Sequence, residues 1–261
     1  MRLATFNVNS IRRRLPHLRR FLARHSPDLV FLQETKCRTE EFPALDLADT
    51  GYRIHALGQP GGRNGVAVLG RIPFEVVSEA LPGDPEDRQA RFLEVRTADG
   101  MHCAGIYLPN GNSGGEDGFA YKLRWLERLA DLVRARLDAF TPFAVLGDFN
   151  VCPTDADLAP GALPPTDALV RPESRARFRA LLHLGMTDVL RALHPAPADT
   201  PFTYWDYGPA FESNRGLRID HILLSPELAE RLMDAGVDTI ARAEEQPSDH
   251  APVWCDLSPS P

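Results

Sequence analysis

The chain has 261 residues, of which 43% are hydrophobic and 25% are charged, and its formal net charge is −7. This composition excludes a chain that is disordered over most of its length, and the acidic balance does not favour a polyanionic partner unless the basic residues cluster. No apolar run approaches the roughly 18–20 residues of a membrane helix, and the N-terminus turns polar too early for a secretory signal. We therefore expect a soluble, cytoplasmic, monomeric protein with no membrane partner and a single domain over residues 1–261.

Short apolar runs between turn residues predict about a dozen strands. In chain order they cover residues 3–8, 29–33, 52–56, 65–70, 74–78, 92–97, 102–107, 143–147, 202–205, 218–224, 237–242 and 251–257. Helices are expected at 15–25, 121–140, 173–184 and 226–235, of which 121–140 has the clearest apolar stripe at 3–4 residue spacing. Residues 111–118 and 152–172 are predicted to be loops. The pattern favours an α/β fold in which two packed sheets carry helices on their outer faces.

Lysine is nearly absent from the chain. Only Lys36 and Lys122 are lysines, so 27 of the 29 basic residues are arginine. A GC-rich genome is the simplest cause, although arginine also binds phosphate bidentately, so that a few residues suffice. The four cysteines form no CxxC pair, which argues against a zinc site or a disulfide framework and favours reduced, mostly buried thiols.

Oxygen-bearing side chains stand at the ends of several apolar runs. They are Asn7, Glu34, Asp148, Asn150, Asp220 and Asp249. Taken singly, such residues are common turn formers. Taken together, oxygen donors at five separate strand ends suit a hard cation such as Mg²⁺, and the lack of paired cysteine or histidine ligands argues against zinc. Asp148 and Asn150 are two residues apart, so on an extended chain both point the same way.

Eight short motifs occur in a fixed order. They are Asn7-Val8-Asn9-Ser10, Leu32-Gln33-Glu34-Thr35-Lys36, Asn64-Gly65-Val66-Ala67, Tyr107-Leu108-Pro109-Asn110-Gly111, Gly147-Asp148-Phe149-Asn150, Thr203-Tyr204-Trp205-Asp206-Tyr207, Arg218-Ile219-Asp220 and Ser248-Asp249-His250-Ala251-Pro252-Val253. With these motifs the chain closely resembles the exonuclease III family of abasic-site (AP) endonucleases, from Met1 to about Leu257. Each motif is weak alone, but eight in order are specific.

The resemblance implies a four-layer α/β sandwich with the site at one end of the two sheets. It implies Mg²⁺, for which Mn²⁺ can substitute, held mainly by Glu34, with Asn7 and Asp249 close by and Asp148 and Asn150 on the other side. It further implies hydrolysis of double-stranded DNA on the 5′ side of abasic sites and 3′-to-5′ trimming, including removal of blocked 3′ ends. Such an enzyme would work in the cytoplasm, at the nucleoid.

The residue chemistry agrees with such a role, because a cation and preset hydrogen-bond donors lower the barrier to attack on an anionic phosphodiester. Asp148 is the expected base for the attacking water, and Asn150 is expected to position that water or the phosphate. His250 would donate to a phosphate oxygen, and Asp220 would orient His250 and favour its charged form. Tyr107 would donate its hydroxyl to the phosphate or the leaving oxygen.

DNA contacts are expected from a second group of residues. By resemblance, Phe202 and Trp205 would wall the pocket for a flipped-out abasic sugar. Asn9, Asn110 and Asn214 are weaker candidates for contacts with the DNA backbone. Each surface arginine taken singly is more simply read as solvated, but some must contact phosphate. The candidates are Arg63, Arg88, Arg91, Arg215 and Arg218.

Two other functions stay open. One is a phosphodiesterase or phosphatase of the same superfamily that acts on RNA, a lipid headgroup or an inositol phosphate; residues 107–111 and 203–207 argue for the DNA-repair branch. The other is a catalytically silent DNA-binding module, against which every key acidic residue is present. The glycine-rich, acidic segment 112–118 departs from the family pattern and leaves open how firmly the chain grips DNA.

Overall fold

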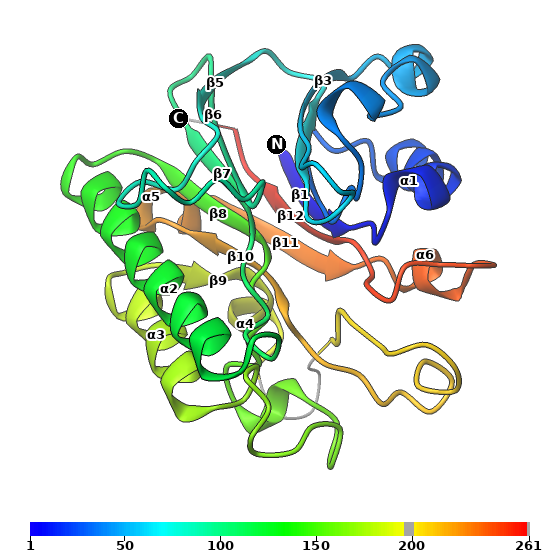
Figure 1. The fold of residues 1–261 in the computed structure, drawn as a ribbon. Coiled ribbons are helices and arrows are strands. Elements are labelled where there is room, and N and C mark those ends of the chain that lie inside the picture. The colour runs from blue at the N-terminus through cyan, green and yellow to red at the C-terminus, as the bar shows by residue number, and fades with distance from the viewer. Residues whose placement is uncertain (196–200, 260–261) are drawn as a thin grey trace.

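The computed structural model describes residues 1–195 and 201–259. Within them the strands form two six-stranded sheets, ordered β11-β12-β1-β2-β4-β3 and β5-β6-β7-β8-β10-β9 (Figure 1). The strands are β1 (Arg2–Asn7), β2 (Leu29–Gln33), β3 (Arg53–Leu57), β4 (Val66–Gly70), β5 (Phe74–Ser78), β6 (Phe92–Thr97), β7 (His102–Tyr107), β8 (Phe143–Asp148), β9 (Thr187–Asp188), β10 (Asp220–Leu224), β11 (Leu232–Val237) and β12 (Val253–Leu257).

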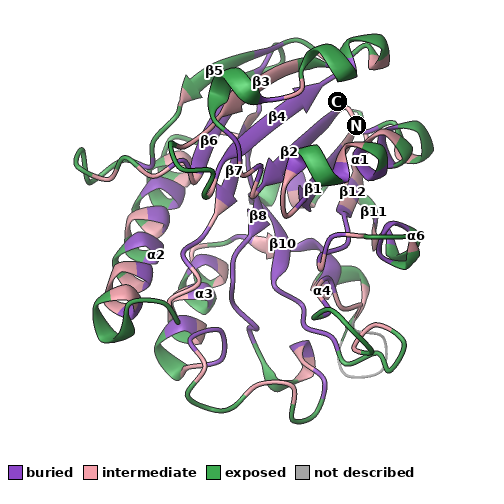
Figure 2. Ribbon diagram, turned by 45° about the vertical axis from the view of Figure 1, so that its right-hand side comes forward, coloured by how far each residue is buried: buried purple, intermediate pink, exposed green. Residues whose placement is uncertain are grey.

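The three longest helices of the described residues cover the outer faces of the sheets, whereas the buried residues of two short ones, Val189, Leu190 and Leu228, pack in the core between the sheets. The helices are α1 (Ile11–His25), α2 (Gly115–Asp138), α3 (Pro172–His183), α4 (Val189–Leu193), α5 (Pro226–Ala229) and α6 (Thr239–Ala243), with short 3₁₀ turns at Thr39–Glu41, Leu45–Thr50 and Asp155–Asp157. Figure 2 shows buried strands in the centre and helices with exposed outer faces. No helix of the described residues is long and apolar enough to cross a membrane. All four cysteines are buried, as expected, and each is free of a disulfide bond.

The alternation of side chains along each strand builds the layers. In β2, Leu29 and Phe31 face the core between the two sheets, whereas Val30 and Leu32 face the layer that contains α1. The second sheet buries its outer face against α2 and α3. The sheets approach so closely that a Cβ added at Gly105 would lie 2.2 Å from the Phe31 ring. The predicted arrangement of two packed mixed sheets flanked by helices is confirmed.

Strand direction places the functional residues at one rim. β1 and β2 are parallel and joined through α1, and β7 and β8 are parallel and joined through α2. The carboxyl ends of parallel strands meet at the same edge of a sheet. β10 and β12 run antiparallel to β8 and β1, so they begin where their partners end, and Asp220 lies opposite Asp148.

Three element predictions are wrong. The predicted helix 226–235 ends at Ala229, and the chain then forms the edge strand β11, which pairs with β12. The predicted strand 237–242 is mostly α6, whose N-cap Asp238 accepts a hydrogen bond from the Ala241 N–H. The predicted strand 202–205 is reduced to one bridging residue, Tyr204, which pairs with both Leu217 and His250. In each case a long-range pairing or a cap outweighs local propensity.

Helix boundaries differ from the prediction in two further places. Helix α2 begins at Gly115, inside the predicted loop 111–118, and α1 begins at Ile11 rather than at residue 15. Pro16 lies within α1. The loop predicted at 152–172 contains one 3₁₀ turn and is partly buried, since Cys152, Leu169 and Val170 pack against Leu217 and Ile219.

Candidate active site

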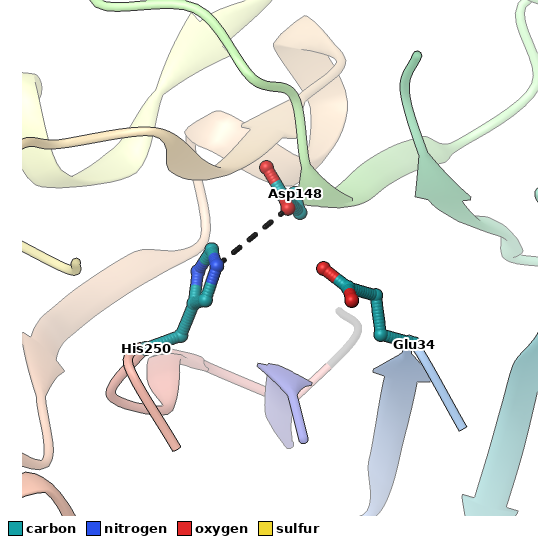
Figure 3. Close-up of side chains that lie close together, drawn as sticks. All are labelled: Glu34, Asp148 and His250. Atoms are coloured by element: carbon teal, nitrogen blue, oxygen red, sulfur yellow. Dashed lines mark ion pairs between the residues drawn. The ribbon is translucent and has the colours of Figure 1, made fainter. Parts of the chain in front are cut away.

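Three strand ends bring Glu34, Asp148 and His250 together. Glu34 follows β2, Asp148 ends β8, and His250 lies just before β12. Each offers one ligand atom, and these atoms all lie within 4.8 Å of one another. Figure 3 shows the three side chains pointing toward one another, with His250 Nε2 3.8 Å from Asp148 Oδ2. Residues more than 200 positions apart thus form one compact polar cluster at the rim shared by both sheets.

Asn7 links the two carboxylates. Its side-chain N–H group donates to Glu34 Oε1 at 2.8 Å and to Asp148 Oδ2 at 2.9 Å, while its Oδ1 accepts from the Asn9 N–H. The Lys36 ammonium lies 2.7 Å from Glu34 Oε2. Burial alone would raise the pKa of Glu34, but the Lys36 charge and the Asn7 hydrogen bond outweigh it and lower that pKa. Glu34 is therefore ionised at neutral pH.

Asp148 is buried, and the site tunes its basicity. Burial is the main cause that raises the pKa of Asp148 to about 7, against the attraction of His250 and with further help from Asp220 and Glu34. The Asn150 N–H donates to Asp148 Oδ1 at 2.9 Å and fixes the orientation of the carboxylate. A carboxylate with a pKa near the working pH suits a general base.

His250 and Asp220 form a buried pair. His250 Nδ1 lies 2.8 Å from Asp220 Oδ2. Burial alone would lower the pKa of His250, but the charge and hydrogen bond of Asp220 outweigh it and raise the pKa to about 10. A protonated imidazole donates and does not ligate a metal. Although His250 belongs to the three-residue cluster, it is therefore better suited to donate to a phosphate oxygen than to hold a cation.

Tyr107 closes the site from β7. The hydroxyl group is hydrogen-bonded to Glu34, and burial, followed by the charges of Glu34 and Asp148, raises its pKa well above the usual range. Tyr107 therefore stays neutral and retains its proton. This is the protonation state that donation to a phosphate or a leaving oxygen requires.

Asn150 and Asn110 are engaged with each other. Asn150 Nδ2 donates to the Leu108 carbonyl oxygen at 2.9 Å, and Asn150 Oδ1 accepts from Asn110 Nδ2 at 2.9 Å. Asn150 also has a left-handed backbone with φ of 48°. The amide of Asn150 thus already has protein partners, so its predicted contact with water or phosphate requires a free lone pair of Oδ1 or an exchange of partners.

Asp249 lies beside the cluster rather than in it. Its Oδ1 accepts from Asn9 Nδ2 at 2.9 Å, and Asn9 Oδ1 accepts from the Lys36 ammonium at 2.6 Å. Asn9 Nδ2 also donates to the Tyr207 hydroxyl at 2.9 Å. Asn9 therefore serves as a hub that ties Asp249 and Lys36 together. The predicted ligand role of Asp249 stays a prediction.

The donor set fits a hard divalent cation. Glu34 and Asp148 present carboxylate oxygens a few ångströms apart, and Asp148 shares its buried surroundings with two further carboxylates, Glu34 and Asp220, whose charges raise its pKa. Oxygen ligands of this kind suit Mg²⁺ or Mn²⁺. A cation held by Glu34 and Asp148 would offset the repulsion between these two carboxylates. The Lys36 ammonium pairs with the Glu34 carboxylate alone.

A cavity of about 370 Å³ adjoins the cluster. Its lining residues are Ala162, Leu163, Tyr204, Asp206, Tyr207, Pro209, Ala210, Ser213, Arg215 and Leu217. Tyr204 connects the two regions, because its ring lies edge-on to His250 with 5.0 Å between the centroids. The cavity combines apolar walls with a few polar groups, as small-ligand sites commonly do.

The predicted pocket walls Phe202 and Trp205 do not line this cavity. Trp205 is buried, its ring packs edge-on against Phe202 and Phe211, and its indole N–H donates to Asn214 Oδ1 at 3.2 Å. Tyr204 and Leu217 are among the residues that line the cavity instead. The predicted role of Phe202 and Trp205 as walls of a pocket for an abasic sugar stays a prediction.

Arg218 is not a phosphate contact, contrary to the expectation. Only 1% of its side chain is exposed, and it pairs with Asp157 at 2.6 Å and with Asp188 at 2.7 Å. Arg91 and Arg215 bond backbone carbonyl groups, of Tyr107 and Gly161 respectively. The charge on Arg218 is thus used inside the protein.

Arg63 and Arg88 are exposed and form no ion pair or hydrogen bond within the described part of the chain. Their loops are joined by Asn64, whose side chain donates to Gln59 at 2.7 Å and to Gln89 at 3.2 Å. The Asn64 carbonyl oxygen accepts from the Lys36 N–H at 3.0 Å. Both arginines therefore extend from loops fixed to the segment that carries Glu34.

Two supporting residues were missed, and both are lysines. Lys36 pairs with Glu34, and Lys122 is fully buried below the loops that carry Asn110 and Asn150. Burial lowers the pKa of Lys122 to about 7, against the attraction of Asp148. The signal was available, because these are the only lysines in a chain that otherwise uses arginine. Lysine at these two positions, in a chain that otherwise uses arginine, points to a role for a compact ammonium group.

Comparisons with known proteins agree with this geometry. Residues 4–250 match the model of the "Endonuclease/Exonuclease/phosphatase family". The chain is 35% identical to exodeoxyribonuclease III of Haemophilus influenzae over 98% of its own length and 100% of the relative's. It superposes with a TM-score of 0.92 and 38% identity on the 3′ phosphatase NExo from Neisseria bound to a product DNA hairpin, covering 99% of both chains. An AP endonuclease from Archaeoglobus fulgidus gives a TM-score of 0.91 and 34% identity, covering 99% of this chain and 100% of the other. The chain therefore belongs to the endonuclease/exonuclease/phosphatase family, which confirms the resemblance seen in its motifs.

Proposed function

We propose that this chain is a Mg²⁺-dependent DNA-repair phosphodiesterase, for which Mn²⁺ can substitute. It hydrolyses duplex DNA on the 5′ side of abasic sites and trims 3′ ends, including blocked ones. The observation that carries the proposal is the convergence of Glu34, Asp148 and the His250–Asp220 pair at one rim of the two sheets. Relatives that are named as an exodeoxyribonuclease III, a 3′ phosphatase and an AP endonuclease, and that match almost the whole chain, support it.

Each residue of the cluster has a defined task in this reaction. Glu34 and Asp148 would hold the cation, which, when bound, neutralises charge on the phosphate oxygens. Asp148 accepts a proton from the attacking water, whose oxygen forms a bond to phosphorus as the bond to the 3′ oxygen breaks. His250 donates a hydrogen bond to a non-bridging phosphate oxygen, and Tyr107 donates to the phosphate or the leaving 3′ oxygen. The products are a 3′-hydroxyl end and a 5′-phosphate end.

The adjoining cavity accounts for the choice of an abasic site. An abasic sugar is extruded from the helix at low cost because it has no base to unstack or unpair. Tyr204 lines the cavity of about 370 Å³ and its ring contacts His250, which supports the placement of an extruded sugar near the cluster. Leu217 forms part of its apolar wall. An intact nucleotide would have to place its base in the same limited volume.

The grip on DNA comes from a few arginines in an acidic protein. Arg63 and Arg88 are exposed and unpaired within the described residues, as is Arg13 at the start of α1, which lines a second cavity with Asn9 and Tyr207. Their charges are free to replace the counterions of DNA phosphates. The carboxylates of the site would in turn be neutralised by the cation. We propose that a monomer suffices for this contact.

An incision assay on a panel of substrates tests the proposed function. The panel contains a duplex with one synthetic abasic site, the intact duplex, a duplex with a 3′-phosphate, a ribo-oligomer and an inositol phospholipid, each with Mg²⁺ and with a chelator. We expect cleavage 5′ to the abasic site and removal of the 3′-phosphate, both abolished by the chelator. Preferred turnover of the ribo-oligomer or the phospholipid would move the chain to another branch of the family. Binding of the duplex without turnover of any substrate would identify a silent binding module.

A further inference from the structure

Three loops of the site meet on one buried ammonium group. Lys122 projects from α2, and its side chain is 0% exposed. Its Nζ donates to the backbone carbonyl oxygens of Asn110 at 2.9 Å, Asn150 at 2.6 Å and Ala168 at 3.2 Å. A lysine ammonium has three donors and no acceptor. All three donors are thus used, and each holds a different loop.

The three loops are those that shape the site. Asn110 follows β7 in the motif that begins with Tyr107, and Asn150 follows β8 and Asp148. Ala168 precedes Leu169 and Val170, which pack against Leu217 of the cavity wall. Further bonds join the same loops, since Asn112 Oδ1 accepts from the Ala168 N–H at 2.8 Å. Lys122 therefore lies at the junction of the loops, below the reacting groups and out of contact with solvent.

A short chain of contacts connects Lys122 to Asp148, the proposed base. Lys122 holds the Asn150 carbonyl group, and the Asn150 N–H donates to Asp148 Oδ1 at 2.9 Å. Asn150 has a φ of 48°, a conformation that side-chain-bearing residues rarely adopt and that needs support from its surroundings. The ammonium bond provides that support. The direction of the Asp148 carboxylate thus depends on a backbone that Lys122 fixes.

The packing around Lys122 explains why it is not arginine. A Cβ added at Gly111, whose φ is 89°, would lie 2.7 Å from Lys122 Cδ, so the stem of the side chain fills its channel. A planar guanidinium is larger and directs its donors in a fork within one plane, whereas an ammonium directs three donors toward separate carbonyl groups. In a chain with 27 arginines among 29 basic residues, this site requires the smaller cation.

We propose that Lys122 is a positioning residue for phosphodiester hydrolysis: by binding the carbonyl groups of Asn110, Asn150 and Ala168, it holds the Asp148 carboxylate in the orientation that takes a proton from water. The inference rests on the proposed function, because its effect on kcat is measured as cleavage of DNA. It predicts that loss of Lys122 slows the chemical step rather than the binding of DNA, because no atom of Lys122 reaches the surface.

Kinetics of three variants test the inference. They are Lys122→Met, which removes the donors, Lys122→Arg, which keeps the charge, and Leu129→Ala, which opens a cavity in the core beneath the same helix and leaves the three ammonium contacts in place. We expect Lys122→Met to lower kcat on an abasic-site duplex about 100-fold, with KM changed less than about threefold. Lys122→Arg should still lose about tenfold in kcat, because charge without the three-way geometry is insufficient. Leu129→Ala should lower Tm but keep kcat well below its Tm.

A structural measurement separates failure of this inference from failure of the proposed function. In the wild-type protein and the folded variants, the NMR amide signals of Asn150 and Asn110 are compared, without DNA or metal. We expect these signals to shift several-fold more in Lys122→Met and Lys122→Arg than in Leu129→Ala. Full kcat in either lysine variant, or a kcat loss in Leu129→Ala equal to that in Lys122→Met, overturns the inference. If the wild-type protein does not cleave DNA, the NMR signals alone decide. Unmoved Asn150 and Asn110 signals in the two Lys122 variants would overturn the inference, and shifted signals would support the positioning role.

Discussion

At the scale of single residues, the site is built on backbone that is costly to form. Asn9, Glu34, Lys36 and Asn150 all have φ between 42° and 52°, in the left-handed region. Such conformations persist only where the surroundings determine them, and they concentrate at functional sites. Here the bonds between Asn7 and Glu34 and between Lys36 and Glu34 provide that restraint. The orientation of the carboxylates is therefore set before any substrate binds.

Replacing Asp148 with asparagine separates chemistry from binding. Asp148→Asn preserves shape but removes the proton acceptor, so we expect incision of an abasic-site duplex to fall about 10²–10⁴-fold. DNA affinity, measured by fluorescence anisotropy, should change less than about threefold. A loss of affinity as large as the loss of rate would assign Asp148 to substrate binding instead.

The pH profile reports the pair of buried titrating groups. In the proposed reaction Asp148 acts in its ionised form, so the rate should rise as pH increases through about 7, or through a lower pH once a cation stabilises that form. The proposed donor His250 acts in its charged form, so the rate should fall as pH rises through about 10. In Asp220→Asn the neighbour that raises the pKa of His250 is gone, and the alkaline limb should move to lower pH. Rate profiles between pH 5.5 and 10.5 check this, and an unmoved alkaline limb would separate His250 from catalysis.

At the scale of elements, a buried ionic network anchors the segment that enters β10. Arg218 bonds Asp157 in a 3₁₀ turn, Asp188 in β9 and His221 Nδ1 at 3.1 Å. Since arginine can only donate, His221 accepts at Nδ1 and donates from Nε2 to the Val151 carbonyl oxygen at 3.0 Å. Two residues after Arg218, Asp220 meets His250. The network thus fixes the start of the strand that carries the histidine's partner.

Breaking this network should be costly. Arg218→Met leaves the carboxylates of Asp157 and Asp188 buried without their main counterion, and such a loss typically costs about 3–5 kcal/mol of unfolding free energy. Urea denaturation measures it. The matched control is Arg134→Ala, which breaks an exposed ion pair with Asp131 and should change stability by less than about 0.5 kcal/mol. Equal effects of the two substitutions would mean that the network is dispensable.

At the scale of the whole molecule, strand ends were predictable because they combine two local signals. Apolar runs followed at once by Glu34 or Asp148 mark where a strand leaves the core, and parallel connections gather those ends at one rim. The oxygen-rich chemistry of the rim followed from residue types alone. The specific roles of Tyr107, His250 and Asp220 came from the resemblance of the motifs, since single residues at strand ends carry no role of their own.

The features that could not be predicted from the sequence depend on contacts between distant segments. Arg218 resembles any arginine beside a strand until the fold places Asp157 and Asp188 around it. The edge strand β11 forms because β12 pairs with it, although its residues continue a plausible helix. Trp205 and Tyr204 are neighbours in sequence, and only the bridges to Leu217 and His250 decide which of them faces the cavity.

An acidic protein that binds DNA should show a clear response to salt. We expect the affinity for duplex DNA to fall as salt rises, despite the net charge of −7. If Arg63 and Arg88 contact phosphate as proposed, an Arg63→Ser, Arg88→Ser double variant should reduce the slope of log Kd against log salt by about 2. The control removes Arg124 and Arg179, two exposed and unpaired arginines of the described chain on α2 and α3. A flat response, or an equal change in the control, would place the DNA elsewhere.

The account rests on Glu34 and Asp148 holding a divalent cation against a DNA phosphate. The most direct measurement is the rate of incision of an abasic-site duplex titrated with Mg²⁺, for the wild-type protein and for Glu34→Ala. Glu34→Ala removes the proposed main oxygen ligand, so the Mg²⁺ concentration for half-maximal rate should rise at least about tenfold. A titration curve that is unchanged in Glu34→Ala, or full wild-type activity in the presence of a chelator, would contradict the account.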